Sequence, residues 1–246
     1  MTGSKGKLEE LMGQLGDKLD PAVYASILEE VEVYQAAVRR ERAQGSFMEY
    51  VKMMWPGFVG GRHHALMAKK FEDIAAGKIS RLIINMAPRH TKSEFASYLL
   101  PSWFLGNYPD KKVIQSSNTA DLAVGFGRKV RNLVSSPAFQ DVFDATLSTD
   151  SKAAGRWNTG AGGDYFAIGV GGAVTGKGAD ILIIDDPHSE QEAKQGNPAV
   201  YDGVYEWYTS GPRQRLQPAR HLPIVAITLR VISPACSFCN AVQLLR

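Results

Sequence analysis

One stretch of the sequence constrains the fold more than any other: Arg81 to Glu94, which reads RLIINMAPRHTKSE. Its apolar start, Leu82 to Ile84, has the length and β-branched content of a buried strand. A turn containing Pro88 follows, and then Lys92 and Ser93 open an apolar-rich segment that we predict to be a helix. Strand, loop, Lys-Ser and helix is the layout of a phosphate-binding P-loop, in which loop amides and the positive end of the helix dipole face an anion.

The loop departs from the strict pattern, which has glycine at the positions of Met86 and Thr91. Glycine at these positions relieves crowding of the backbone around the phosphates. By itself, Lys-Ser at the start of a helix is also typical of an ordinary capped helix. The interpretation as a nucleotide-binding loop therefore needs support from elsewhere in the chain.

That support comes from a second apolar run, Ile181 to Ile184, which leads directly into Asp185 and Asp186. Four bulky apolar residues followed by two acids are typical of a buried parallel strand that delivers carboxylates to its carboxyl end, where α/β sheets bind ligands. The alternative is a strand followed by an Asp-Asp-Pro turn. Asp185 follows Lys92 by 93 residues, which leaves room for several βα units. The two motifs together favour nucleotide hydrolysis by an α/β protein with a mainly parallel sheet flanked by helices.

Composition excludes several other classes of protein. With 246 residues, 44% of them hydrophobic and 22% charged, the chain is typical of a soluble globular protein. No apolar run approaches the roughly 18 residues of a membrane helix, and residues 1–20 lack a secretory apolar core, so we expect a cytoplasmic protein without a membrane partner. The net charge of +3 permits a local basic face but does not by itself predict nucleic-acid binding. Cys236 and Cys239 have no second pair to complete a zinc site, so we predict two free thiols.

Local signals predict the other elements. A helix is expected over residues 21–45, capped by Asp20, and another opens at His63. Ser46 and Glu49 have the spacing of a capping box for a short helix between these two. Further along the chain we expect strands at 112–115, 156–158, 165–170 and 222–227, helices at 120–134 and 201–210, and a polar loop over 148–163 around the second of these strands.

Two groups of residues have two interpretations each. His63 and His64 point in different directions on a helix, which makes them a poor metal pair. They either cap the helix and pack in the core, or one of them lies near a nucleotide base. The helix expected after the second strand carries Arg128, Lys129 and Arg131. These side chains either form a solvated face or contact the phosphates of a nucleic acid.

With these motifs in place, the chain resembles the large terminase subunit of tailed bacteriophages, the motor that packages DNA. The resemblance covers roughly residues 46–230. It depends on the deviant phosphate loop Asn85–Glu94 and on the acidic strand Gly178–His188, and two shorter stretches, Ser102–Gly106 and Phe126–Arg131, are also similar to the family. The family often tolerates a residue other than glycine before the lysine, as this chain does.

The resemblance implies an ASCE-type P-loop ATPase fold and roles for individual residues. Lys92 would bind the β- and γ-phosphates of ATP, and Arg89 would sense or stabilise the γ-phosphate. Ser93 and Asp185 would hold Mg²⁺. The nucleotide would contact the loop and a histidine that precedes it, namely Ala87, Pro88, Arg89, His90, Thr91, Lys92, Ser93, Glu94 and His64.

Two further roles follow from the resemblance. Asp186 occupies the position where many relatives carry a glutamate that polarises the attacking water. Its side chain is one methylene shorter than glutamate, and Glu190 is a weaker candidate for the same role. Thr228 and Arg230 occupy the family's coupling motif, which links hydrolysis to DNA movement.

The implied function is ATP hydrolysis that drives viral double-stranded DNA into a procapsid in the host cytoplasm. The implied partners are the DNA, the terminase small subunit and the portal protein, with copies of the chain forming a homo-oligomeric ring on the portal. The chain would divide into a helical N-terminal extension (1–45), a P-loop ATPase domain (46–230) and an atypical C-terminal tail (231–246). One rival is a helicase-like nucleic-acid translocase, which would need a second motor lobe. The other is a truncated, catalytically weak fragment that acts only as a binding module.

The C-terminal end departs from the family. Relatives continue into a nuclease domain with an RNase H-like fold, which needs several acids to hold two metals. Here sixteen residues follow Arg230, and none is Asp or Glu, so we expect no nuclease activity from this chain. Our hypothesis is that Leu229 to Arg246 is not native family sequence and arose by a frameshift or by read-through into an insertion. Sequencing the gene tests this hypothesis, which fails if no downstream frame encodes a nuclease-like domain.

Overall fold

The structure, a computed structural model, describes residues 13, 19–87, 89–189, 191, 194, 197–216, 224–230 and 241–243. Contacts within the chain divide it into two units, residues 1–42 and residues 43–246. Pro88, Glu190, Cys236 and Cys239 lie outside the described residues, as does most of the tail over 231–246. Within the described part of the chain, no helix is long and apolar enough to cross a membrane.

The helix α2 (Pro21–Gly45) has the bounds that the sequence predicts, and it runs from the first unit into the start of the second. Asp20 caps it, because its Oδ1 atom accepts a hydrogen bond of 2.9 Å from the backbone N–H of Ala22. Proline suits the first helical position, where its missing N–H would have no partner in the helix. Among the residues of this described helix only Ala43 is buried.

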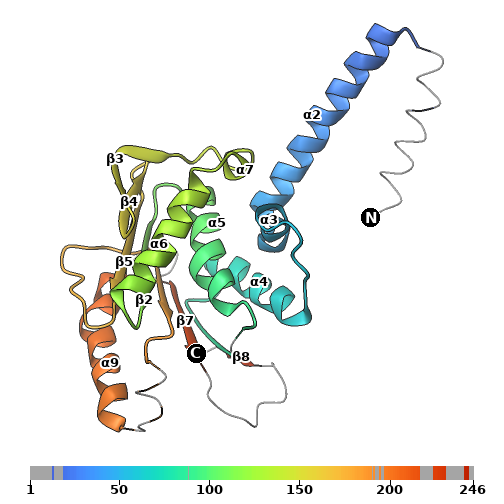
Figure 1. Cartoon of the computed structure of the whole chain (residues 1–246). Coiled ribbons are helices and arrows are strands. Elements are labelled where there is room, and N and C mark those ends of the chain that lie inside the picture. The colour runs from blue at the N-terminus through green and yellow to red at the C-terminus, as the bar shows by residue number, and fades with distance from the viewer. Residues whose placement is uncertain are drawn as a thin grey trace. The chain divides into compact units, whose positions relative to one another are not determined.

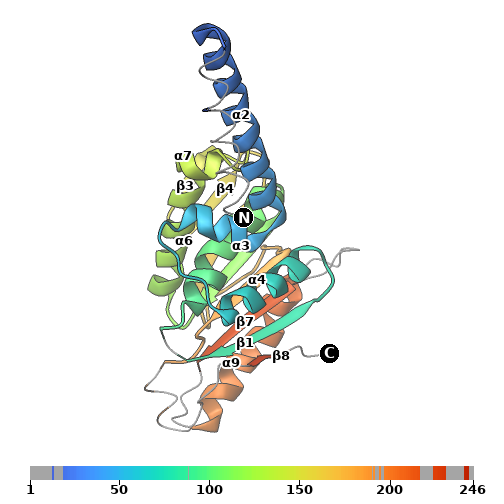
Figure 2. The ribbon, with the colours of Figure 1, turned by 90° about the vertical axis from the view of Figure 1, so that its right-hand side faces the viewer.

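A mainly parallel sheet forms the centre of the second unit, which confirms the expected fold class at this level. The strand order is β3-β4-β5-β2-β6-β7-β1-β8, and the sheet can be followed in two views (Figure 1, Figure 2). The inner strands from β5 to β1 are parallel to one another, whereas β3, β4 and β8 pair antiparallel at the two edges. The strands are β1 (Arg81–Met86), β2 (Lys112–Ser117), β3 (Leu147–Ala153), β4 (Arg156–Thr159), β5 (Asp164–Gly169), β6 (Ile181–Asp185), β7 (Ile224–Arg230) and β8 (Ala241–Gln243).

Helices cover the sheet on both sides. The helix α6 packs on β2 and β5, and the π-helix η1 packs on β6, while α9 contributes Tyr208 to the core on the opposite face. The helices of the second unit are α3 (Phe47–Met54), α4 (Arg62–Ala75), η1 (Glu94–Leu99), α5 (Leu100–Asn107), α6 (Ala120–Val134), α7 (Pro137–Gln140), α9 (Pro198–Ser210) and the short 3₁₀ turn η2 (Pro212–Arg215).

The central strand β6 is buried on both faces, which explains why its sequence is apolar before the acids. Ile181 and Ile183 belong to the larger core, which includes side chains from α3, α4, α5 and α6. Leu182 and Ile184 belong to a smaller core on the other face, against which Tyr208 packs. Side chains alternate between faces along a strand, so a strand covered on both sides reads as a continuous apolar run. The acids of this strand consequently lie at its carboxyl end.

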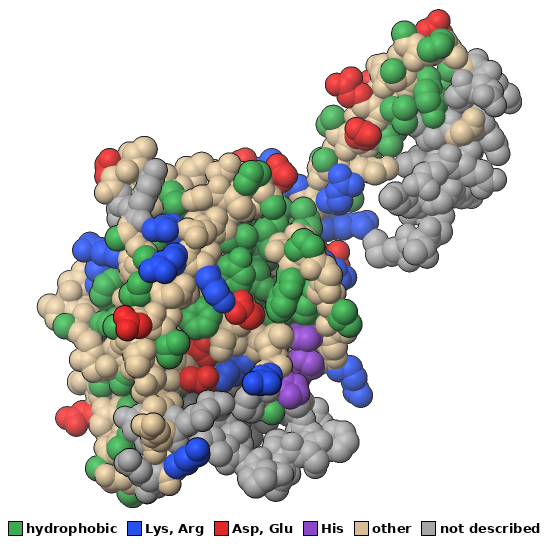
Figure 3. All heavy atoms as spheres, in the orientation of Figure 1, with side chains coloured by type: hydrophobic (Ala, Val, Ile, Leu, Met, Phe, Trp, Pro, Cys, Tyr) green, Lys and Arg blue, Asp and Glu red, His purple; other side chains and the backbone are tan. Residues whose placement is uncertain are grey.

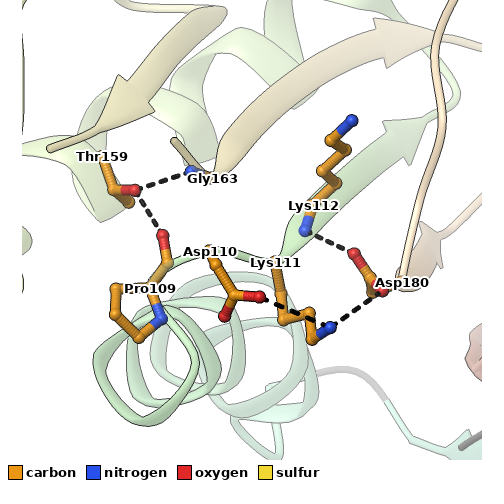
Figure 4. Close-up of polar contacts among 7 residues, drawn as sticks. All are labelled: Pro109, Asp110, Lys111, Lys112, Thr159, Gly163 and Asp180. Atoms are coloured by element: carbon orange, nitrogen blue, oxygen red, sulfur yellow. Dashed lines mark hydrogen bonds and ion pairs between the residues drawn. The ribbon is translucent and has the colours of Figure 1, made fainter. Parts of the chain in front are cut away.

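The opposite end of the sheet is held together by backbone groups and short polar side chains (Figure 4). The hydroxyl of Thr159 donates to the backbone oxygen of Pro109 and accepts a hydrogen bond of 2.9 Å from the N–H of Gly163. Next to this contact, Asp180 accepts a hydrogen bond of 2.8 Å from the N–H of Lys112, which joins the starts of β2 and β6. These contacts set the register of β2 against its neighbours, and so align the carboxyl ends at the far edge.

Two local predictions are wrong. Ser46 and Glu49 do not form a capping box, because Glu72 of α4 accepts hydrogen bonds from the N–H of Phe47 (2.8 Å) and from the Ser46 hydroxyl (3.3 Å). A tertiary contact thus replaces the local one at the start of α3. The stretch over 148–163 is more than a loop with one strand, because β3 lies within it and pairs with β4 as an antiparallel hairpin.

The variant Gly163→Ala should destabilise the second unit by about 2 kcal/mol or more. An added Cβ would lie closer to the backbone oxygens of Pro109 and Lys111 than Cβ atoms approach in proteins, so the backbone would have to shift. Gly125→Ala in α6 is the matched control, because no heavy atom outside the local helix lies within 4 Å of its added Cβ. Alanine is the better helix former by about 1 kcal/mol, so this control should be at least as stable as the wild type. Urea unfolding followed by circular dichroism compares the two, and an equal loss in both would contradict the close-packing argument.

Candidate phosphate-binding site

The loop after β1 lies at the carboxyl edge of the parallel sheet. The strand ends at Met86, and the helix that follows begins at Lys92, so the described residues 87 and 89–91 lie in the loop. Because β1, β7 and β6 are parallel, the carboxyl ends of β1 and β6 meet at the same edge. This is the edge of an α/β sheet at which ligands bind.

The structure brings the two sequence motifs into direct contact. The Nζ atom of Lys92 lies 2.5 Å from Oδ1 of Asp186, which forms an ion pair between residues 94 positions apart. The Lys92 side chain is only 7% exposed, whereas that of Asp186 is 36% exposed. A buried ammonium requires a compensating negative charge, and Asp186 supplies it here. An anionic ligand at the loop would be able to take over the same role.

Asp185 is the more deeply buried of the two acids, with 3% exposure. Its Oδ2 atom accepts a hydrogen bond of 2.8 Å from the hydroxyl of Ser97, which belongs to η1. In the sheet, Asp185 is in register with Ser117 of β2 and with Thr228 of β7. The acid is therefore fixed both by its strand and by the helix that follows the loop.

The helix after the loop is not a regular α-helix. Residues Glu94–Leu99 form the π-helix η1, and the backbone N–H of Leu100 donates to the oxygen of Phe95, five residues earlier. Helices of this kind are rare and frequently occur at functional sites. The widened turn carries Ser97, which reaches Asp185. The sequence predicts a helix here but not this widening.

The backbone is strained at both loops of the site. Among the described residues, those other than glycine with a positive φ are Arg89 (63°), Thr91 (60°) and Asp186 (44°). Such conformations cost of order 1–3 kcal/mol each and persist only where the surroundings hold them. Of the two positions at which the strict phosphate loop has glycine, Thr91 takes the left-handed conformation, whereas Met86 is an ordinary strand residue. Of the two missing glycines, only the one replaced by Thr91 leaves the backbone strained.

His64 contacts this strained residue. Its Nε2 atom lies 2.7 Å from Oγ1 of Thr91, and its Nδ1 atom accepts a hydrogen bond of 2.8 Å from the N–H of Gly61. Because Nδ1 accepts, the ring proton lies on Nε2 and is donated to Thr91. The hydroxyl of Thr91 in turn donates to the backbone oxygen of His90 at 2.6 Å. His64 thus caps α4 and is buried, as the first alternative for the histidine pair expects, whereas a position near a nucleotide base stays a prediction.

Burial keeps His64 neutral. Desolvation, together with charge repulsion from the neighbouring His63 and His90, lowers its pKa from 6.5 to about 4. The rings of His63 and His64 are 3.8 Å apart, and those of His63 and His90 are 5.9 Å apart. Histidine side chains gather on one face of the molecule beside lysine, arginine and hydrophobic side chains (Figure 3). The same causes, burial first and then His90, lower the pKa of His63.

The remaining loop residues lie around this contact. Arg89 is exposed, and Ala87, His90 and Ser93 are half-buried. Glu94, at the start of η1, forms an ion pair of 2.8 Å with Lys129 of α6. Pro88 and Glu190 lie outside the residues that the structure describes, so their expected roles stay predictions.

The basic residues of α6 and the coupling residues of β7 have different surroundings. Arg128 is exposed, whereas Lys129 pairs with Glu94 and Arg131 donates to Asn132 at 3.0 Å. Lys129 therefore belongs to the surroundings of the loop, and contact of this helix with DNA stays a prediction.

On β7, Thr228 is in register with Asp185 and Ile84, and Arg230 with Met86. Both coupling candidates thus lie in the strand between the two site strands.

Sequence reasoning missed Ser97 and the bond between His64 and Thr91. The available signal for Ser97 is a single small polar residue within the apolar stretch Phe95–Leu100. No local pattern pairs a histidine with a threonine 27 positions later. Both contacts depend on the packing of α4 and η1, which only the fold determines.

Comparisons with known proteins give limited information. The sequence matches no family model and no curated protein. Among solved structures, the chain is similar to the crystal structure of the HK97 bacteriophage large terminase, with 12% sequence identity and a TM-score of 0.44. The match covers 71% of this chain and 33% of the other, so this chain spans about a third of that terminase's length. Because the TM-score is this low, the function has to be inferred from the residues of the site.

The neutral His64 predicts a dependence of stability on pH. The folded chain keeps this ring neutral down to a pKa of about 4, whereas the unfolded chain protonates it near 6.5. The unfolded state therefore binds more protons between these values, so the contribution to stability is complete above pH 6.5 and is lost as the pH falls towards 4. Urea unfolding of the wild type and of His64→Gln over about pH 4–7 measures this contribution of His64 to the free energy of unfolding. The free energy of unfolding should fall less steeply with decreasing pH in the variant, and parallel curves would contradict the assignment.

Proposed function

We propose that this chain is the ATPase domain of a viral DNA-packaging motor and hydrolyses ATP with Mg²⁺ to drive double-stranded DNA into a procapsid. The observation that carries the hydrolytic part is the ion pair of 2.5 Å between Lys92 and Asp186. It brings the phosphate-loop lysine and the acidic strand together, and phosphoryl transfer uses a lysine on the phosphates and an acid at the metal ion within one site. The packaging part is supported by the terminase-like motifs over residues 46–230.

The strand order supports an ASCE-type P-loop fold. The strand β7 lies between β1, which leads into the phosphate loop, and β6, which leads into the acids. Thr228 and Arg230 lie in β7 next to both site strands. We infer that these two residues link hydrolysis to DNA movement. We also propose the division into a helical extension (1–45), an ATPase domain (46–230) and a tail (231–246).

The side chains near the loop fit a nucleotide and a magnesium ion. Mg²⁺ prefers oxygen ligands, and the carboxylate of Asp185 and the hydroxyl of Ser93 are of this kind. When bound, the ion would neutralise charge on the phosphates. Lys92 would exchange its partner Asp186 for the β- and γ-phosphates, and Arg89, which is exposed in the loop, would contact the γ-phosphate. Asp186, released from the lysine, would orient the attacking water.

The proposed partners follow from the packaging role. They are double-stranded DNA, a terminase small subunit and a portal protein, with several copies of the chain arranged as a ring in the host cytoplasm. Arg128 is the exposed candidate for a DNA phosphate contact on α6. Lys129 would contribute only if it left Glu94.

Steady-state ATPase activity and thermal stabilisation test the proposal. ATP with Mg²⁺ should stabilise the wild type by about 2.7 kcal/mol at a ligand concentration one hundredfold above Kd. Lys92→Ala should abolish both this gain and turnover, whereas Lys78→Ala, at an exposed lysine before β1, should preserve both. Double-stranded DNA should raise the turnover rate. A folded wild type that ATP does not stabilise would overturn the proposal and favour a non-catalytic fragment.

Asp186→Asn should separate binding from turnover. Asp186 competes with a phosphate for Lys92. A phosphate that binds must break this ion pair, which is worth about 1 kcal/mol because it is partly exposed. Removing the charge should therefore tighten binding of ATP with Mg²⁺ about fivefold while lowering kcat strongly. Isothermal titration calorimetry and a phosphate-release assay measure the two effects. Weaker binding with unchanged kcat would exclude Asp186 from the role proposed here.

A further inference from the structure

The backbone of Thr91 adopts a conformation that is unusual for a threonine. Its φ of 60° lies in the left-handed region, where a β-branched residue is a genuine outlier. Such a conformation persists only when its surroundings over-determine it. A glycine would adopt this φ without strain. Thr91 must be held in it by contacts with other parts of the fold.

The contacts of His64 provide that constraint. Its side chain is 6% exposed, and both ring nitrogens are engaged, one with Gly61 at 2.8 Å and one with Thr91 at 2.7 Å. The ring stacks on Phe95 with 4.9 Å between centroids, and Phe58 meets it edge-on at the same distance. The ring is thus fixed from both sides, and its position fixes the hydroxyl that it binds.

The conformation of Thr91 matters because of what the loop presents. Alternating right-handed and left-handed residues turn successive backbone N–H groups towards one point and create a concavity that binds anions. Arg89 and Thr91 supply left-handed residues in this loop, and Lys92 follows directly. A loop that relaxed at Thr91 would lose the concavity next to the lysine.

We propose that His64 is a positioning residue that holds Thr91, and with it the phosphate loop, in the conformation that receives the nucleotide phosphates. The inference rests on the proposed function, because it takes the loop to bind a nucleotide. It differs from a contact between His64 and the nucleotide base, since neither ring nitrogen is available for one. His64 acts through Thr91 and takes the place of the glycine that a strict phosphate loop would have.

A double-mutant cycle on the full chain tests this inference, with Mg·ADP as the probe in isothermal titration calorimetry. His64→Ala removes the hydrogen bond that holds Thr91 and should raise Kd about tenfold, the equivalent of one buried hydrogen bond. In the Thr91→Gly background the same substitution should change Kd less than about twofold, because glycine adopts a positive φ without a clamp. This suppression is a readout that a merely structural role of His64 would not produce.

Lys69→Ala is the matched control, because Lys69 lies on α4 with His64 but is exposed. It should leave Kd within about twofold of the wild type. If His64→Ala does not fold, Thr91→Val makes the same test from the other partner, since it keeps the shape of the side chain and removes the oxygen that accepts from His64. It should also raise Kd about tenfold.

The outcomes separate the two proposals. A wild type that binds Mg·ADP, with the same Kd in His64→Ala, overturns the positioning role and leaves the nucleotide site standing. An equal loss of affinity in the wild-type and Thr91→Gly backgrounds also overturns it, because His64 would then act on the nucleotide or on the fold by another route. A folded wild type that binds no Mg·ADP overturns the proposed function and this inference together.

Discussion

Burial of the central sheet on both faces is the constraint from which the rest of the structure follows. A strand such as β6 can be covered on both sides only if its side chains are apolar throughout, and it is packed into one core through Ile181 and Ile183 and into another through Leu182 and Ile184. Charged residues are then confined to the ends of such strands. Because the inner strands are parallel, the ends that carry Asp185 and the loop before Lys92 fall on one edge. The fold thereby brings the charged side chains of the two motifs together although they are far apart in the sequence.

In the site that results, each unfavourable feature, such as a buried charge or a strained backbone, is stabilised by another residue of the site. A buried ammonium at Lys92 needs a negative charge, and Asp186 provides it from a backbone that is itself in the left-handed region. A loop without glycine needs an external hold, and His64 provides it with a neutral ring whose tautomer is set by Gly61. Ser97 connects the buried acid Asp185 to the helix after the loop. Lys92 and Asp186 thus satisfy each other, and an anion that bound Lys92 would have to replace a carboxylate.

Much of the fold was predictable because its signals are local or periodic. The bounds of α2 follow from a cap and a proline, and the apolar runs at β1 and β6 correctly indicate buried parallel strands. Lys92 and Asp186, which the sequence motifs place 94 positions apart, are in direct contact. Their roles in binding ATP and Mg²⁺, like those of Thr228 and Arg230, stay predictions.

Errors arose where a distant residue competes with a near one. At the start of α3, Glu72 accepts hydrogen bonds from the N–H of Phe47 and from the Ser46 hydroxyl, while Glu49 pairs with Lys52. A partner fixed by tertiary packing thus binds the hydroxyl that the local capping box would have used. The bond between His64 and Thr91 and the widened turn of η1 were out of reach for the same reason. Neither has a periodic signature. The first depends on how α4 packs near the loop, and the second lies in a helix that packs against β6 and α6.

The position of β7 has a consequence for how the chain must fold. It is the latest of the parallel strands in the sequence, yet it lies between β1 and β6, which do not touch in the finished sheet. A chain synthesised only as far as residue 223 therefore carries two facing strand edges with no partner between them. Unpaired edges invite pairing with other chains, and contacts of such high sequence separation form slowly. The central gap is filled by a strand that is made after all the other parallel strands of the sheet, so the nascent chain is most prone to association before β7 is added.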